Sequence, residues 1–129
     1  MTRQPHILFA DDDCDIRELV QLILETAGFR VSTADNAADV LRLVTTESFA
    51  ALLLDYWMRD TTGIELCRDI RIFNQSTPIL ICSGAVTPAD KEAATRAGAQ
   101  GYIGKPFSSL DLIRALGALV MVSGGGPER

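Results

Sequence analysis

The stretch that decides the fold lies near the start of the chain, where residues 6–13 read HILFADDD. Residues 7–10 are a continuous apolar run, which is typical of a strand buried on both faces. Three carboxylates follow at once, Asp11, Asp12 and Asp13. Placing several carboxylates at the end of a buried strand is costly unless a cation compensates them. Hard divalent cations prefer oxygen ligands, so this junction is the first candidate for a functional site.

The alternation of an apolar run with a helical stripe continues along the chain. Runs typical of strands occupy residues 7–10, 29–34, 50–54, 79–82 and 101–104. The second run is more polar than the others and is expected at an edge of the sheet. Between the runs, apolar residues recur at helical spacing. The first such stripe comprises Ile16, Leu19, Val20, Ile23 and Leu24. Five strand–helix units predict an α/β fold, with a single doubly wound parallel sheet and helices on both of its faces.

Several residues are expected to mark the ends of these elements. Asp13 is expected at the start of the first helix, and Thr87 followed by proline is expected to start the fourth. Gly63 indicates a turn before the third helix, and Asp60 indicates turn chemistry just ahead of it. His6 is expected to be an exposed residue at the start of the first strand.

The totals limit the possible functions. The 129 residues suit one domain, expected over 1–122, with a flexible glycine-rich tail at 123–129. The net charge of −5 argues against binding to nucleic acid or to an anionic membrane surface. No apolar stretch approaches the ~20 residues that span a bilayer, and the N-terminus is no signal peptide, so we expect a cytoplasmic protein. Three cysteines without a CxxC pair, and a single histidine, suggest neither a disulfide framework nor a zinc site.

Residues with reactive side chains follow four of the five predicted strands. The acidic pair follows the first strand, Asp55 the third, Ser83 the fourth and Lys105 the fifth. Ligands of such sheets bind beyond the carboxyl ends of the strands, so these residues are expected to meet in space. The set suits phosphoryl transfer to the Asp55 carboxylate, with Mg²⁺ (or Mn²⁺) held by the acidic residues. Lys105 and a hydrogen bond from Ser83 would neutralise the phosphoryl oxygens.

Four segments, ILFADDD, ALLLDYWMRDTTGIEL, ILICSG and GYIGKPF, resemble the response-regulator receiver domain of two-component signalling. The likeness runs from Ile7 to the last helix, in the order and spacing of that family, whose members include chemotaxis regulators. It implies a flavodoxin-like (βα)5 fold with strand order 2-1-3-4-5.

The resemblance also implies roles for residues at the site. It makes Asp55 the phosphoacceptor, while Asp11 and Asp12 match the family's acidic metal pair. The main-chain carbonyl of Trp57 matches a further metal ligand. The resemblance therefore implies Mg²⁺ (or Mn²⁺) bound by Asp11, Asp12, Asp55 and that carbonyl.

A second group matches the parts of the family that respond to phosphorylation. Ser83 matches the switch hydroxyl and Tyr102 the switch aromatic, while Lys105 precedes the family's cis proline, Pro106. In the family the hydroxyl moves toward the phosphoryl group and the aromatic follows. The resemblance thus implies a surface with two states over the fourth strand, fourth helix and fifth strand.

The implied function is a phosphoacceptor receiver domain rather than a metabolic enzyme. A sensor histidine kinase or a phosphotransfer protein would donate the phosphoryl group, and the domain would catalyse its own phosphorylation and dephosphorylation. Output would pass to a downstream protein through the face of helix four, strand five and helix five, where a homodimer could also form. Both a single-domain regulator and a receiver from a longer chain fit the sequence.

Two positions depart from the family pattern. Met58 and Arg59 stand where Met-Pro is usual, so the loop after the acceptor lacks the proline that normally stiffens it. Gly84 stands where alanine is common. Trp57 is bulky and two residues past Asp55, and we expect it to slow hydrolysis of the phosphoryl-aspartate.

Three other functions compete with this one. A phosphohydrolase with an aspartyl-phosphate intermediate needs a second aspartate two residues after the nucleophile, where this chain has Trp57. A flavodoxin-like nucleotide binder needs a phosphate cradle after the first strand, where this chain has carboxylates. A receiver-like interaction module that works without phosphorylation remains the alternative.

Overall fold

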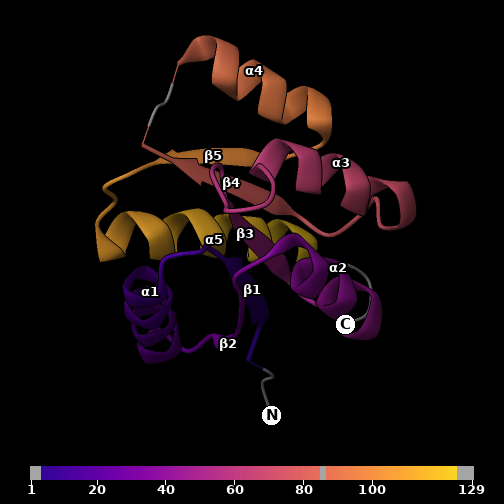
Figure 1. Cartoon of the computed structure of the whole chain (residues 1–129). Helices are drawn as coiled ribbons and strands as arrows, with labels where there is room; N and C mark the ends of the chain where they lie inside the picture. Colours follow the sequence, from indigo (N-terminus) through magenta and orange to yellow (C-terminus); the bar gives the residue numbers. More distant parts are fainter. Residues whose placement is uncertain (1–3, 85–86, 125–129) are drawn as a thin grey trace.

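A five-stranded parallel sheet forms the centre of the molecule and carries helices on both faces (Figure 1). It is seen in a computed structural model, which describes residues 4–84 and 87–124. The strand order is β2-β1-β3-β4-β5, so the predicted fold and strand order are confirmed. No helix within those two ranges combines the length and apolar character needed to cross a bilayer.

Strands and helices alternate along the whole chain. The strands are β1 (His6–Ala10), β2 (Arg30–Ala34), β3 (Ala51–Asp55), β4 (Ile79–Ser83) and β5 (Gly101–Gly104). The helices are α1 (Cys14–Thr26), α2 (Ala37–Thr46), α3 (Gly63–Phe73), α4 (Pro88–Ala97) and α5 (Ser109–Gly124). The more polar strand, β2, lies at an edge as predicted. The last helix enters the predicted tail as far as Gly124, and residues 125–129 lie outside the described part of the chain.

The core consists of two apolar layers, one on each face of the sheet. Because side chains alternate along a strand, neighbouring residues of β1 enter different layers. Leu8 belongs to the layer beneath α2, α3 and α4, whereas Ile7 and Phe9 belong to the layer beneath α1 and α5. Every residue of β1, β3 and β4 is buried, which explains why these strands read as continuous apolar runs.

The helix starts follow the capping residues in the sequence. Asp13 is the N-cap of α1, and its Oδ1 accepts hydrogen bonds from the backbone N–H groups of Asp15 (2.9 Å) and Ile16 (3.2 Å). Thr87 and Asp90 form a reciprocal capping box at the start of α4. Both predicted helix starts are therefore confirmed.

Two positions differ from what their sequence patterns indicate. Leu19 belongs to the apolar stripe of α1 but is 54% exposed, because α1 buries only the side of the stripe that faces the sheet. Gly63 does not form a turn but is the first residue of α3. A Cβ at Gly63 would lie 2.8 Å from the carbonyl oxygen of Asp55, so this glycine permits close approach of two backbones.

His6 is buried rather than exposed, with 8% of its surface accessible. Its Nε2 lies 2.8 Å from the Ser32 hydroxyl, and its ring centroid lies 4.5 Å from that of Phe49. Burial, followed by the charge of Arg30, lowers the pKa of this ring below 6.5, although Glu47 opposes the change. Periodicity did not reveal this environment because its partners come from other elements.

The buried imidazole predicts a specific loss of stability in mild acid. Since its pKa is lower in the folded than in the unfolded state, the unfolded chain binds the proton more tightly. The stabilisation from the neutral ring is therefore complete above the unfolded pKa of about 6.5 and is lost as the pH falls below it. Urea unfolding of the wild type and His6→Gln at pH 7.5 and 5.5 should show a smaller acid-induced loss in the variant. Equal losses in the two proteins would contradict the assignment.

Candidate functional site

The carboxyl ends of the central strands bring an amine and several carboxylates together. Asp11 follows β1, Asp55 is the last residue of β3, and Lys105 follows β5. The Nζ of Lys105 lies 2.8 Å from Asp55 Oδ1 and 3.0 Å from Asp11 Oδ2. Residues that are far apart in the sequence thus form one charged cluster, as the strand-end argument predicted.

Asp12 completes an acidic group with the composition of a cation site. One carboxylate oxygen from each of Asp11, Asp12 and Asp55 lies within 4.8 Å of the others. Asp11 and Asp55 are buried, whereas Asp12 is partly exposed. One ammonium group against three carboxylates leaves two negative charges uncompensated. These donors fit a divalent cation such as Mg²⁺, which commonly combines one or two carboxylates with water and phosphate oxygens.

The backbone around Asp11 is held from three sides. The Nη1 of Arg17, on α1, donates a hydrogen bond of 2.8 Å to the Asp11 carbonyl. The Asp11 side chain accepts a 2.9 Å bond from the N–H of Asp13, and its own N–H donates to the Ala34 carbonyl (3.1 Å). Arg17 could not be identified from the sequence, since nothing in its helical position indicates that its side chain reaches back to the strand end.

The acceptor candidate Asp55 is fixed by β4 and by the start of α3. It pairs with Cys82 in the sheet, and the next residue, Tyr56, donates its N–H to the Cys82 carbonyl (2.8 Å). The Tyr56 carbonyl in turn accepts the N–H of Gly63 (2.8 Å). Because Gly63 lacks a side chain, the start of α3 can lie against the Asp55 backbone. Asp55 therefore occupies a rigid position at the carboxyl end of the central strand β3.

Burial and neighbouring charges act together on the ionisation of this cluster. Burial raises the pKa of Asp55, and repulsion from Asp11 and Asp12 raises it further against the opposing effect of Lys105. Burial alone would lower the pKa of Lys105, but hydrogen bonds to Asp55 and Asp11 outweigh it, and the net change is upward. The lysine is thus a permanent cation, and the carboxylates still favour a further positive charge.

The predicted switch residues line a groove beside the acidic cluster. This groove has a volume of about 80 Å³ and is bounded by Tyr56, Trp57, Ser83, Asp90 and Tyr102. Ser83 is almost completely buried, whereas Trp57 is 66% exposed with its ring 5.0 Å from that of Tyr56. Burial raises the pKa of the Tyr102 phenol, and a side-chain hydrogen bond with Ser83 opposes the rise. The hydroxyl and the aromatic residue therefore interact, although their roles as a switch stay predictions.

One backbone feature of the site agrees with what the family resemblance implied. The Lys105–Pro106 peptide bond is cis, as the resemblance implied.

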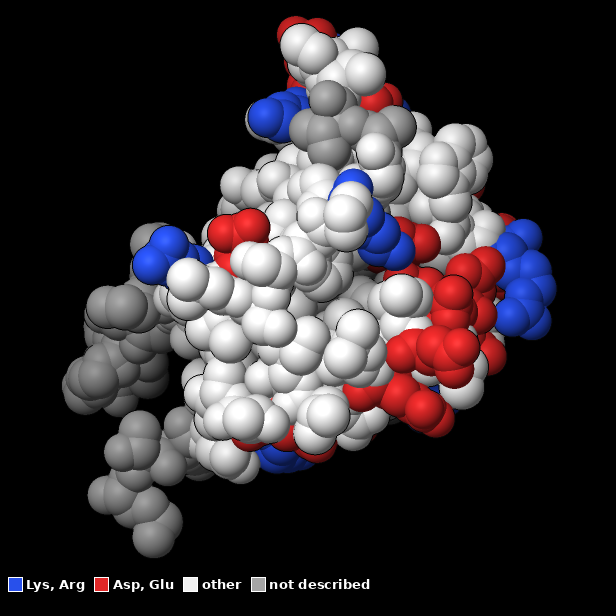
Figure 2. All heavy atoms as spheres, turned by 90° about the vertical axis from the view of Figure 1, so that its left-hand side faces the viewer, with Lys and Arg blue, Asp and Glu red and all other residues white. Residues whose placement is uncertain are grey.

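Seen toward the carboxyl ends of the strands, the surface has acidic side chains gathered on one side and a broad uncharged area beside them (Figure 2).

Comparison with known proteins assigns most of the chain to one family. Residues 7–117 match the family model described as the response regulator receiver domain. The chain belongs to the response regulator receiver domain family. This receiver domain is 35% identical over 116 residues to the transcriptional regulatory protein GltR of Pseudomonas aeruginosa, covering 88% of this chain and 48% of GltR. The receiver domain spans about half the length of the curated relatives it matches.

Solved structures agree with the assignment. A CheY-like receiver domain protein from Methanospirillum hungatei superposes with a TM-score of 0.90 at 26% identity, covering 95% of this chain and 98% of that one. The chemotaxis response regulator CheY4 of Vibrio cholerae gives a TM-score of 0.86 at 29% identity, with 91% and 99% covered. The predicted family is therefore confirmed, and this chain is a response regulator receiver domain of two-component signalling.

Proposed function

We propose that the Asp55 carboxylate accepts a phosphoryl group from a phosphohistidine of a sensor kinase or phosphotransfer protein. The observation that carries the proposal is the ammonium group of Lys105 between Asp55 and Asp11, inside an acidic group that still lacks positive charge. An incoming phosphoryl group and a carboxylate repel each other, so transfer needs cations on more than one side.

The transfer forms one bond and breaks one. A carboxylate oxygen of Asp55 attacks phosphorus, and the bond from phosphorus to the donor imidazole nitrogen breaks, which leaves the electron pair on that nitrogen. Mg²⁺ held by Asp11, Asp12, Asp55 and the Trp57 carbonyl would supply positive charge to the phosphoryl oxygens. Lys105 neutralises a phosphoryl oxygen and orients it, because its amine already lies 2.8 Å from Asp55. Hydrolysis later returns Asp55 to a carboxylate and ends the signal.

The groove beside Asp55 couples this chemistry to the surface. Once Asp55 carries the phosphoryl group, the Ser83 hydroxyl donates to a phosphoryl oxygen and its interaction with Tyr102 changes. The adjacent helix α4 buries only Ala94 and Ala97, so shifting it costs little apolar contact. We therefore place the output surface, for a downstream protein or a second copy, on α4, β5 and α5.

Intact-mass spectrometry with acetyl phosphate tests the acceptor chemistry. The wild type should gain one phosphoryl group with Mg²⁺ and none after the metal is chelated. Asp55→Asn keeps the size of the side chain but removes the nucleophile, and should gain none under either condition. A wild type that folds and binds Mg²⁺ but is never phosphorylated would favour the interaction module that works without phosphorylation.

Trp57 is predicted to protect the phosphoryl group. Its large ring lies at the rim of the groove next to Asp55, where it can restrict the approach of water. Trp57→Ala should therefore raise the rate of phosphoryl loss severalfold, measured by intact mass after removal of the donor. Trp57→Phe, which keeps an aromatic ring, is the matched control and should lie closer to the wild type. A decay that is unchanged or slower in Trp57→Ala would rule out the protective role.

A further inference from the structure

The loop after Asp55 is closed by its own backbone but ends in an exposed tip. An antiparallel bridge joins Trp57 to Thr62, and the N–H of Met58 donates to the Thr61 carbonyl (3.1 Å). The Met58 side chain is 7% exposed and packs in the core beneath α2 and α3. Arg59, which stands where the family usually has proline, is exposed at the tip. The proline ring that would restrict the backbone at position 59 is therefore missing.

Asp60 supplies a contact between this tip and a different part of the chain. Both of its carboxylate oxygens lie 3.3 Å from the backbone nitrogen of Ala37, the first residue of α2, and accept its N–H. That N–H has no partner within the helix, and the helix start carries partial positive charge, so a carboxylate is favoured there. The contact joins two loops that both lie at the carboxyl edge of the sheet, 23 residues apart in the sequence.

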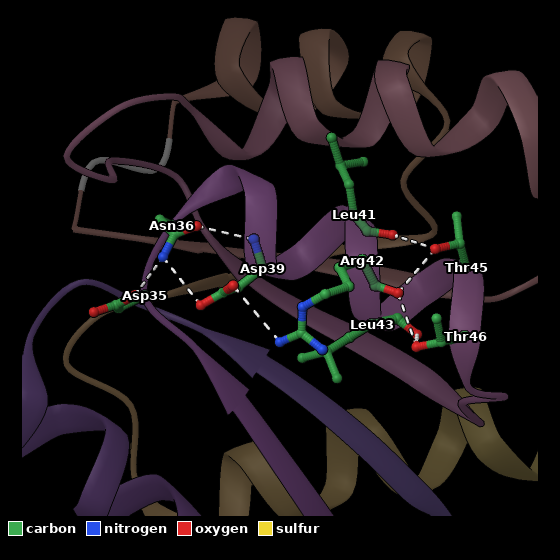
Figure 3. A network of polar contacts seen from close by, with 8 residues as sticks. All are labelled: Asp35, Asn36, Asp39, Leu41, Arg42, Leu43, Thr45 and Thr46. Atoms are coloured by element: carbon green, nitrogen blue, oxygen red, sulfur yellow. Dashed lines mark hydrogen bonds and ion pairs between the residues drawn. The ribbon is translucent and has the colours of Figure 1, made fainter.

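The start of α2 also has capping contacts of its own, which are separate from the contact with Asp60. The Asn36 side chain accepts the N–H of Asp39 (2.9 Å) and donates to the carboxylates of Asp35 (2.6 Å) and Asp39 (3.1 Å) (Figure 3). Asp39 also lies 3.6 Å from Arg42. These contacts of Asn36 go to residues beside it in the chain, whereas Asp60 reaches the helix start from the loop after Asp55.

We propose that Asp60 is a positioning residue that holds the Trp57 segment against α2 and so aligns its carbonyl for Mg²⁺. This inference rests on the proposed function, in which that carbonyl is a metal ligand. Asp60 thus takes over part of the stiffening that proline gives at position 59 elsewhere in the family. It lies outside the acidic cluster and has no place in the transfer itself.

Titration with Mg²⁺, followed through the emission of the single tryptophan, tests the proposal. Asp60→Ala should weaken Mg²⁺ binding by about tenfold, the effect typical of removing a group that orients a metal ligand. Asn36→Ala is the matched control, because it weakens the same helix start without touching the loop. It should lower stability to urea but leave Mg²⁺ affinity within about twofold. Equal affinity in Asp60→Ala and wild type, or equal losses in both variants, would overturn the proposal.

Asp60→Asn separates the hydrogen bond from the charge. An amide oxygen can still accept the Ala37 N–H but carries no charge to attract a cation. We expect Asp60→Asn to bind Mg²⁺ nearly as tightly as the wild type. A loss of Mg²⁺ affinity as large as that of Asp60→Ala would overturn the positioning role and indicate that the charge of Asp60 alone attracts the cation.

A measurement without metal keeps this inference separate from the proposed function. Time-resolved anisotropy should show faster local motion of Trp57 in Asp60→Ala than in Asn36→Ala or the wild type. If the wild type failed to bind Mg²⁺ but this difference in motion appeared, the proposed metal site would be wrong, while the role of Asp60 in holding the Trp57 segment would be supported. If Mg²⁺ bound but the motion of Trp57 was the same in all three proteins, the role of Asp60 would be refuted and the proposed metal site would not.

Discussion

Lys105→Ala is expected to lower the rate of phosphorylation by acetyl phosphate by roughly 100- to 1,000-fold, the usual effect of removing one preorganised group that stabilises charge in a transition state. The lysine amine is the cation paired with both Asp55 and Asp11 in the described part of the chain. Its loss leaves the phosphoryl oxygens without their neutralising partner on that side. The measurement is the initial rate of phosphoryl gain at saturating Mg²⁺.

Metal binding provides the control for this variant. Removing Lys105 makes the acidic group more negative, so Lys105→Ala should bind Mg²⁺ at least as tightly as the wild type. Retained metal binding with slow transfer would show that the site is folded and that the amine acts in the transfer. Transfer at the wild-type rate would contradict the role given to Lys105.

Asp12→Asn is expected to weaken Mg²⁺ binding by at least about tenfold, since even groups that only orient a ligand commonly contribute that much. Asp12 is the partly exposed member of the acidic group, and its replacement removes a charge while keeping the shape of the side chain. Phosphorylation should become correspondingly dependent on high Mg²⁺ concentration. Tryptophan emission and intact mass measure the two effects.

Asp13→Asn is a closely matched control for Asp12→Asn. It makes the same chemical change one residue away, at the N-cap of α1, where asparagine is as favourable as aspartate. Its Mg²⁺ affinity should stay close to that of the wild type. If both variants lost affinity equally, general electrostatic attraction rather than coordination by Asp12 would explain the binding.

Local patterns predicted a doubly wound parallel sheet, whereas the strand order was implied by the family resemblance. The continuous apolar runs of β1, β3 and β4 predicted buried parallel strands because such strands have no polar face. The rule that parallel sheets bind ligands at their carboxyl ends then placed Asp11, Asp55 and Lys105 together. These inferences succeed because side-chain period and strand direction depend on neighbouring residues and on topology alone.

Contacts between distant loops could not be predicted in the same way. The position of Asp60 in the sequence indicates turn chemistry, yet its carboxylate reaches the start of α2. The place of His6 at the start of the first strand predicts an exposed side chain, yet Ser32 and Phe49 help to enclose it. Gly63 indicated a turn, but its role comes from the backbone of β3 passing close by. Each depends on a partner whose position is fixed only by the assembled fold.

The most direct test of the account is to locate the phosphoryl group on the chain. Borohydride reduces an aspartyl phosphate to homoserine and leaves free carboxylates unchanged. After treatment of the receiver domain with acetyl phosphate and Mg²⁺, peptide mass spectrometry should find homoserine at position 55 and nowhere else. Homoserine at Asp11 or Asp12, or none in protein whose intact mass includes a phosphoryl group, would contradict Asp55 as the acceptor.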